Sequence, residues 1–226
     1  MNSLLSGYES LEICTDASLK IIDGRTFTCS GAICCNTQEK KFRILADSTN
    51  NKGELVAIHQ GVLLAIEEIK KCPGRYARVN LYSDSQFGIL GIRDWFQSWY
   101  SKMDNDGIIY NASGAPVKNQ ELFFMVITEC IINNLTVNFY NQKGHVDLYS
   151  KSSMDEAEQQ FKQANGFFIR YDQLYKISYY NNIIDKDSRR LLDSVQASQY
   201  PIMDACDNPV HLCEYKVSPN YKNFIK

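Results

Sequence analysis

The order of the predicted elements is the feature that most restricts the fold of this chain. Three β-like segments joined by short links favour an antiparallel meander. A long helix then leads to a fourth strand, and such a crossover predicts that strand four returns parallel to strand one. The five strands are expected at residues 11–19, 26–36, 40–48, 78–83 and 135–142. The order predicts an α/β architecture with a mixed five-stranded sheet flanked by helices.

The crossover helix is the clearest of the helical segments. Apolar residues recur at helical spacing from Leu55 to Ile69, Asn50 or Asn51 can cap its start, and Cys-Pro-Gly follows its end. Further helices are predicted at 84–100 with Ser85 as a cap, at 118–134, at 152–166 with Ser152 or Ser153 at its start and Asn165-Gly166 at its end, and in the second half of 167–196.

Composition limits the classes of protein that this chain can belong to. It has 226 residues, of which 44% are hydrophobic, enough for one large domain with a real core. The net charge of −2 means that any basic surface for nucleic acid must be local. No apolar run approaches the roughly 18 residues of a membrane span, and no signal peptide is recognisable, so we expect a cytoplasmic protein with no membrane partner.

The eight cysteines carry no recognisable metal-binding or redox motif. No Cys-x-x-Cys pair is present, and most lie in apolar, strand-like runs, where they are expected to pack as small buried thiols. Cys206 and Cys213, close to the end of the chain, are the one pair worth checking for a disulfide.

Three carboxylates are expected to meet at one edge of the predicted sheet. Asp16 lies on the first strand, Asp84 ends the fourth, and Glu54 lies in the first turns of the crossover helix. Adjacent strands are about 4.8 Å apart, so these side chains can reach one site. Their mutual repulsion would be relieved by hard divalent cations such as Mg²⁺ or Mn²⁺, which prefer oxygen ligands.

Six short stretches, in order, resemble type 1 ribonuclease H. They are TDAS at 15–18, STNNKGELVAI at 48–58, YSDSQFGILGIRDWFQSW at 82–99, PVKNQEL at 116–122, QKGH at 142–145 and NNIIDKDSR at 181–189. The likeness spans about residues 9–195. It implies an RNase H-like sheet of strand order 3-2-1-4-5, with the second strand antiparallel.

The resemblance also implies a reaction and a set of site residues. Hydrolysis of the RNA strand of an RNA–DNA hybrid would use two Mg²⁺ ions, with Mn²⁺ as a substitute, and would leave 5′-phosphate and 3′-hydroxyl ends. No small-molecule cofactor is implied, and the oligomeric state is not predicted. The implied metal ligands are Asp16, Glu54, Asp84 and Asp185; His145 would assist proton transfer and product release; Asn50, Asn51, Gln86, Trp95, Trp99 and Asn119 would bind substrate.

The chain departs from the family pattern in two ways. His145 and Asp185 are 40 residues apart, so residues 147–180 are interpreted as an insertion within a catalytic domain at 1–198, followed by an irregular tail at 199–226. The family's basic protrusion has few positive charges here, which leaves Lys118, Lys143, Arg189 and Arg190 as candidates for contacts with the DNA backbone.

Two other functions fit the same residues. One is a catalytically silent module that binds hybrids, since a fold does not fix a function. The other is a different nuclease on this fold, such as a junction resolvase.

Overall fold

The computed structural model describes residues 9–200 and 221–226. Its centre is a five-stranded sheet of order β3-β2-β1-β4-β5, as predicted. β1 pairs antiparallel with β2 and parallel with β4, which confirms the predicted return of the fourth strand beside the first. The strands are β1 Glu9–Ile22, β2 Arg25–Cys34, β3 Lys40–Ala46, β4 Tyr76–Ser83 and β5 Val137–Asn141.

A two-residue turn joins β1 to β2. Asp23 has φ 51° and Gly24 has φ 78°, so both central residues lie in the left-handed region. Asp-Gly suits this conformation, whose twist matches that of the flanking strands. The tight turn keeps the hairpin in register up to the pair of Asp16 and Gly31.

The helices follow the predicted order with shifted ends. The longest are α1 Asn50–Lys71, α4 Gln120–Ile132, α5 Lys151–Asn165 and α6 Tyr171–Asp193. The predicted helix at 84–100 is three consecutive pieces, α2 Gln86–Leu90, a π-helical turn Gly91–Trp95 (η1) and α3 Phe96–Tyr100. Two short 3₁₀ turns, Ala197–Gln199 (η2) and Tyr221–Asn223 (η4), complete the described elements.

Two of the predicted helix caps are wrong. Thr49 caps α1 by accepting a hydrogen bond from the backbone N–H of Lys52, so Asn50 and Asn51 are inside the helix. Ser150 caps α5 in the same way, a few residues before the predicted start. Ser85 caps α2 as predicted, and Gly166 ends α5 with φ 83°.

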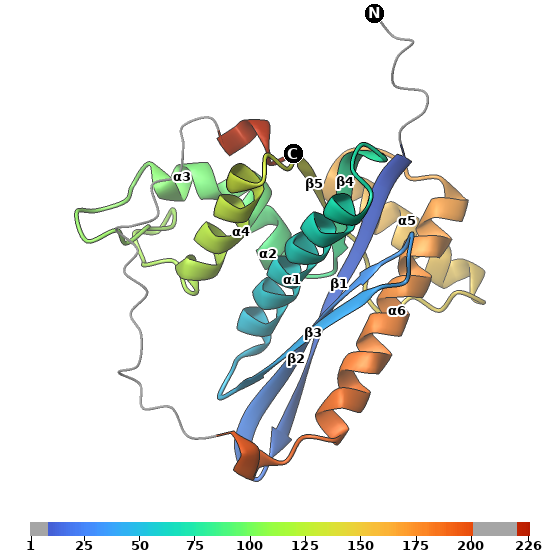
Figure 1. Ribbon diagram of the computed structural model, residues 1–226, viewed down its shortest axis with the longest axis horizontal. Helices are drawn as coiled ribbons and strands as arrows, with labels where there is room; N and C mark the ends of the chain where they lie inside the picture. Colours follow the sequence, from blue (N-terminus) through green and yellow to red (C-terminus); the bar gives the residue numbers. More distant parts are fainter. Residues whose placement is uncertain (1–8, 201–220) are drawn as a thin grey trace, which may run out of the picture.

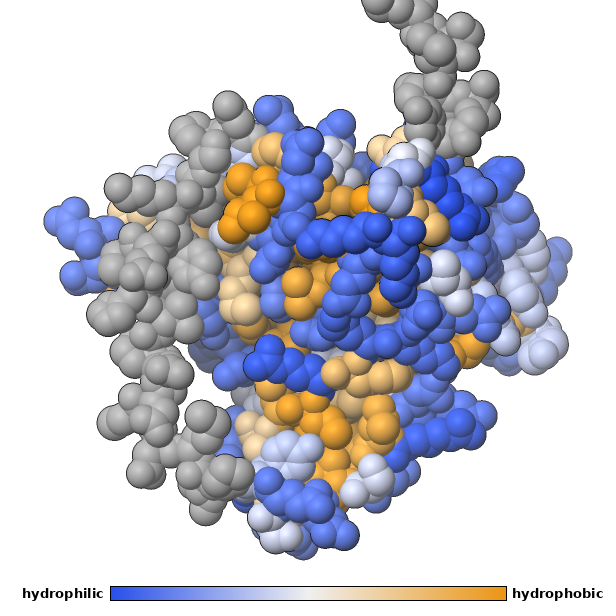
Figure 2. All heavy atoms as spheres, viewed as in Figure 1, coloured by the Kyte–Doolittle hydropathy of each residue, from blue (hydrophilic) through white to orange (hydrophobic). Residues whose placement is uncertain are grey.

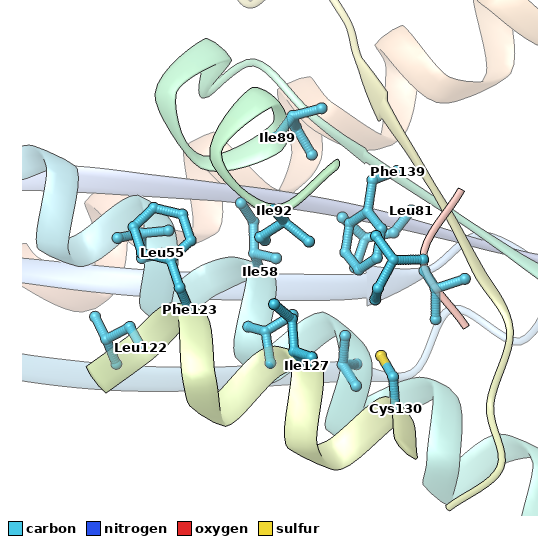
Figure 3. Packing of buried hydrophobic residues seen from close by; sticks show 14 of the residues in the cluster. Leu55, Ile58, Leu81, Ile89, Ile92, Leu122, Phe123, Ile127, Cys130 and Phe139 are labelled. Atoms are coloured by element: carbon cyan, nitrogen blue, oxygen red, sulfur yellow. The ribbon is translucent and has the colours of Figure 1, made fainter. Parts of the chain in front are cut away.

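Helices cover both faces of the sheet (Figure 1). On one face, α1 and α4 pack over the strands, and the side chains of Leu55, Ile58, Leu81, Phe123 and Phe139 point toward one another in this core (Figure 3). On the other face, α5 and α6 enclose a second apolar cluster built around Cys14, Tyr82, Phe161 and Ile177. In the same view as Figure 1, hydrophilic residues cover most of the surface, and hydrophobic residues gather in its lower centre (Figure 2).

The last six residues add to the sheet. Val137 donates a backbone hydrogen bond to Phe224 and Phe139 donates one to Lys226, so this short segment lies along β5. Tyr221 is buried in the α1 side of the core.

Cys206 and Cys213 lie outside the described residues. The described cysteines are free thiols, and all are buried except Cys72; they are Cys14, Cys29, Cys34, Cys35, Cys72 and Cys130. None of the helices in the described ranges is long and apolar enough to cross a membrane.

Candidate active site

Asp16 and Asp84 are brought together by the parallel pairing of β1 and β4. Thr15 and Ser83 are partners in this register, so each aspartate comes one residue after its partnered neighbour. Asp84 follows the last residue of β4, and Ser85 begins the cap of α2 directly behind it. The chain therefore turns away from the sheet at the point where Asp84 meets Asp16.

Glu54 is aimed at the same place by contacts between α1 and β2. The Ser30 hydroxyl donates a hydrogen bond of 2.7 Å to the backbone carbonyl of Gly53. A Cβ on Gly53 would lie 3.0 Å from Thr28, so glycine permits this close approach. The start of α1 is thus held on the sheet, and the next side chain, Glu54, turns toward Asp16.

The three carboxylates form one cluster. Each offers an oxygen that lies within 4.8 Å of the oxygens of the other two. Burial raises the pKa of Asp16 and of Glu54 well above their usual ranges, and the neighbouring acids raise both further. Burial also raises the pKa of Asp84, although His145 opposes that shift. Glu54 Oε2 is buried and has no hydrogen-bond partner among the described residues. A hard cation with oxygen ligands would neutralise this charge and satisfy this oxygen.

Asp185 reaches the cluster from α6 because Gly31 lets the helix approach β2. A Cβ on Gly31 would lie 2.8 Å from both Ile184 Cγ1 and Ser188 Oγ. The Asp185 carboxylate accepts a hydrogen bond of 3.2 Å from the Ser18 hydroxyl and forms an ion pair of 2.8 Å with Arg189. Its charge raises the pKa of Asp16. Asp185 therefore lies at the margin of the three-carboxylate cluster and interacts with it.

His145 lies over the cluster on a loop. Its imidazole is 65% exposed, and Nδ1 is 3.5 Å from Asp185 Oδ2. The backbone of His145 is left-handed, with φ 51°. The preceding Gly144 packs directly on Asp84, since a Cβ there would lie 2.2 Å from Asp84 Oδ2. The loop thus holds the imidazole beside the acids while leaving it open to solvent.

A cavity of about 730 Å³ surrounds this constellation. Asn50, Asn51 and Gln86, predicted to bind substrate, line it together with all five predicted catalytic residues. Arg189 and Lys20 also line it. The cavity is large enough to accept a short piece of a polymer chain. It presents amide and cationic groups around an acidic centre.

The remaining predicted substrate residues lie elsewhere. Trp95 and Trp99 line a second cavity of about 440 Å³, and Phe87 lines both cavities. Trp95 is 39% exposed, whereas Trp99 is 6% exposed and belongs to the core. Asn119 lines neither of these two cavities in the described structure; it precedes α4 with a left-handed φ of 55°.

Several residues around the acids were not recognised from the sequence. Ser18, which is buried, and Lys20, which is exposed, lie on the same face of β1 as Asp16, and only the period of two along that strand could have indicated them. Among the basic side chains expected to contact a DNA backbone, three form ion pairs within the chain: Lys143 with Glu156, Arg189 with Asp185 and Arg190 with Asp187. Lys118 is exposed.

A sheet of this order, with carboxylates converging where the parallel pairing of β1 and β4 ends, has the architecture of RNase H-like nucleases. The family model described as RNase H matches residues 8–162, more than half of the chain, and the chain belongs to this family of endoribonucleases. The match ends before α6, so Asp185 lies beyond it.

Curated relatives agree with this assignment. The chain is 27% identical to a ribonuclease H of Pseudomonas fluorescens over 148 residues, which cover 66% of this chain and 89% of the relative. It is 27% identical to a ribonuclease HI of Pseudomonas syringae pv. tomato over 61% of this chain and 82% of the relative. A ribonuclease H of Neorickettsia sennetsu is 38% identical over 34% of this chain and 44% of its own length.

Proposed function

We propose that the chain cleaves the RNA strand of RNA–DNA hybrids with two divalent cations. The single observation that carries the proposal is the cluster of three carboxylates, two of them buried, whose oxygens lie within 4.8 Å of one another in a cavity of about 730 Å³. Such a cluster is costly to build unless a cation occupies it.

Asp16, Glu54, Asp84 and Asp185 would hold the metal ions. The orphaned Glu54 Oε2 and the raised pKa values of the three clustered acids fit a hard cation with oxygen ligands, for which Mg²⁺ is the first candidate and Mn²⁺ a substitute. When bound, the ions would supply activation of the attacking water and stabilisation of charge on the leaving 3′ oxygen.

The other side chains of the cavity serve binding and proton transfer. His145 is exposed next to Asp185, where it can take a proton or release one to solvent as the products leave. Arg189 also holds the Asp185 carboxylate. Hydrolysis would break the bond from phosphorus to the 3′ oxygen, leaving 5′-phosphate and 3′-hydroxyl ends.

Asn50, Asn51 and Gln86 are candidates to recognise the RNA strand. Their amides line the cavity beside the acids, and amides can both donate to and accept from the 2′-hydroxyls that distinguish RNA from DNA. The second cavity adjoins the first through Phe87 and offers the exposed Trp95 as a surface for the other strand. Trp99 supports Trp95, because their ring centroids are 5.7 Å apart.

Residues 147–180, which we propose as an insertion in the catalytic domain, include α5 and the first turns of α6. Since α6 continues to Asp185, this segment and the fourth acid share one helix.

The decisive experiment uses three labelled substrates with Mg²⁺: an RNA–DNA hybrid, an RNA duplex and a DNA duplex. We expect cutting of the hybrid's RNA alone, with 5′-phosphate ends, and loss of cutting when a chelator is added. Asp84→Asn should abolish cutting and retain hybrid binding, whereas Asp172→Asn, an exposed aspartate outside both cavities, should change neither. Hybrid binding without any cutting would favour a silent module, and preferential cutting of branched DNA would favour a resolvase.

A further inference from the structure

The loop that carries His145 runs from Gln142 to Val146, between β5 and α5, and is termed the histidine loop. Two adjacent residues of α6, Asn181 and Asn182, each hold one end of it. They lie one turn before Asp185 on the same helix. The role of this loop in catalysis rests on the proposed function of His145. Its two anchors, in contrast, are hydrogen bonds that the folded chain forms by itself.

The start of the histidine loop is anchored in the interior. Gln142 Nε2 donates a hydrogen bond of 2.8 Å to Asn181 Oδ1, and both side chains are buried. The backbone N–H of Gln142 also donates to the carbonyl of Ser83, the residue before Asp84. The first anchor therefore ties the loop both to α6 and to the end of β4.

The end of the histidine loop is anchored by the neighbouring asparagine. Asn182 Nδ2 donates a hydrogen bond of 2.8 Å to the backbone carbonyl of Val146. The Val146 side chain is buried in the cluster beneath α5 and α6. Because consecutive residues of a helix point about 100° apart, Asn181 faces the core while Asn182 faces the loop.

Between the two anchors the loop has little freedom. Gly144 touches Asp84 so closely that no side chain would fit there. His145 adopts a left-handed backbone conformation that is unfavourable for a residue with a Cβ. Both features place the imidazole against Asp185, at 3.5 Å. Such a conformation persists only when the surrounding contacts enforce it.

We propose that Asn181 and Asn182 are positioning residues that clamp the histidine loop, so that α6 sets His145 and Asp185 together. The prediction is that loss of the Asn182 amide frees the end of the loop while the metal-binding acids stay in place.

The first test measures the loop without any catalysis. Lys143 lies within the loop, and trypsin cuts after lysine when the backbone opens locally. Asn182→Ala should be cut at Lys143 roughly two- to tenfold faster than wild type, because one of the two anchoring hydrogen bonds is lost. Asn133→Ala is the matched control, since Asn133 Nδ2 donates a similar bond of 2.9 Å to the carbonyl of Glu129 at the end of α4, remote from the loop. An unchanged rate of cutting at Lys143 in Asn182→Ala would overturn the proposal.

The second test separates positioning from general stability. Asn182→Ala should lower kcat for hybrid cleavage with little change in KM, Asn182→Gln should restore part of it, and Asn133→Ala should have the kcat of wild type. In a double-mutant cycle, Asn182→Ala should have no further effect once His145→Ala is present. Additive effects of the two substitutions would contradict the clamp. If wild type cut no hybrid at all, the proposed function would fail, and the trypsin result would still decide whether the loop is clamped.

Discussion

Gly31 stands opposite Asp16 in the β1–β2 ladder, and α6 packs directly on it. The missing side chain at Gly31 lets Ile184 and Ser188 rest on the strand. Asp185 follows Ile184 directly, so this contact sets how near the fourth acid comes to Asp16. The contact between Gly31 and α6, which involves none of the acids, therefore controls the geometry of the site.

Gly31→Ala should displace α6 and with it Asp185. Overpacking of this kind costs about 1–3 kcal/mol, which urea unfolding will measure. Cleavage activity per folded molecule should also fall, because Asp185 moves away from Asp16. Gly91→Ala is the control: its Cβ would meet Phe123 at 2.4 Å, on the α4 side of the core and away from the acids, so it should lose stability and keep activity. Equal loss of activity in the two variants would contradict this account of α6.

Binding of Mg²⁺ should stabilise the folded protein. At 100 times its dissociation constant a ligand contributes about 2.7 kcal/mol, which corresponds to a rise in Tm of about 5–10 °C for a domain of this size. Thermal unfolding with and without Mg²⁺ checks this. Asp84→Asn should reduce the rise, and Asp172→Asn should leave it unchanged, because Asp172 pairs with Arg170 outside both cavities. A rise in Tm that is the same in both variants would show that Mg²⁺ binds elsewhere.

The stability of the metal-free protein should depend on the protonation of Glu54. Burial and then the charges of Asp16 and Asp84 raise the pKa of Glu54 in the folded state. The folded state therefore holds a proton that the unfolded state releases. This contribution to stability is fully present below the ordinary glutamate pKa of about 4.3 and is lost as the pH rises through the raised value.

Glu54→Gln removes this dependence because an amide does not titrate. In the presence of a chelator, Glu54→Gln should be more stable than wild type near neutral pH, and the difference should shrink as the pH falls toward about 4.3. Urea unfolding at a series of pH values measures the difference. A gap that stays constant with pH would mean that Glu54 is charged at all of these pH values in the folded protein.

The periodicity of side chains made the sheet and α1 predictable. Alternation in the strands and the recurrence of apolar residues from Leu55 to Ile69 reflect burial of one face, which is a local property of the sequence. The crossover rule then placed β4 beside β1, and this pairing brought Asp84 to Asp16. The positions of these acids thus followed from local pattern and a single rule of topology.

Features that depend on distant contacts could not be predicted in the same way. Thr49, Asn50 and Asn51 are all acceptable caps by residue type, and only the structure shows that Thr49 makes the capping bond while Gly53 packs on Thr28. The start of α6 at Tyr171 likewise depends on the cluster that it covers with α5. The anchors of the histidine loop join residues nearly 40 positions apart, for which no local signal exists.

The end of the chain gives the strongest case of a contact hidden from sequence pattern. The sequence predicts an irregular tail at 199–226, yet Tyr221 is 6% exposed and packs edge-on against Phe96, with ring centroids 5.6 Å apart. Burial raises the pKa of Tyr221 to about 12. The segment after it pairs with β5 through Val137 and Phe139.

Tyr221→Ala should therefore destabilise the protein by about 3–5 kcal/mol, the usual cost of deleting a large buried aromatic side chain. Tyr149→Ala is the matched control, because Tyr149 is 95% exposed and its removal should change the free energy of unfolding by less than about 0.5 kcal/mol. Urea unfolding of both variants measures these costs. The fraction of Tyr221→Ala protein that stays folded should still cleave hybrid, because the histidine loop continues from β5 and not from residues 221–226. A cost as small as that of Tyr149→Ala would mean that residues 221–226 contribute little to the core in solution.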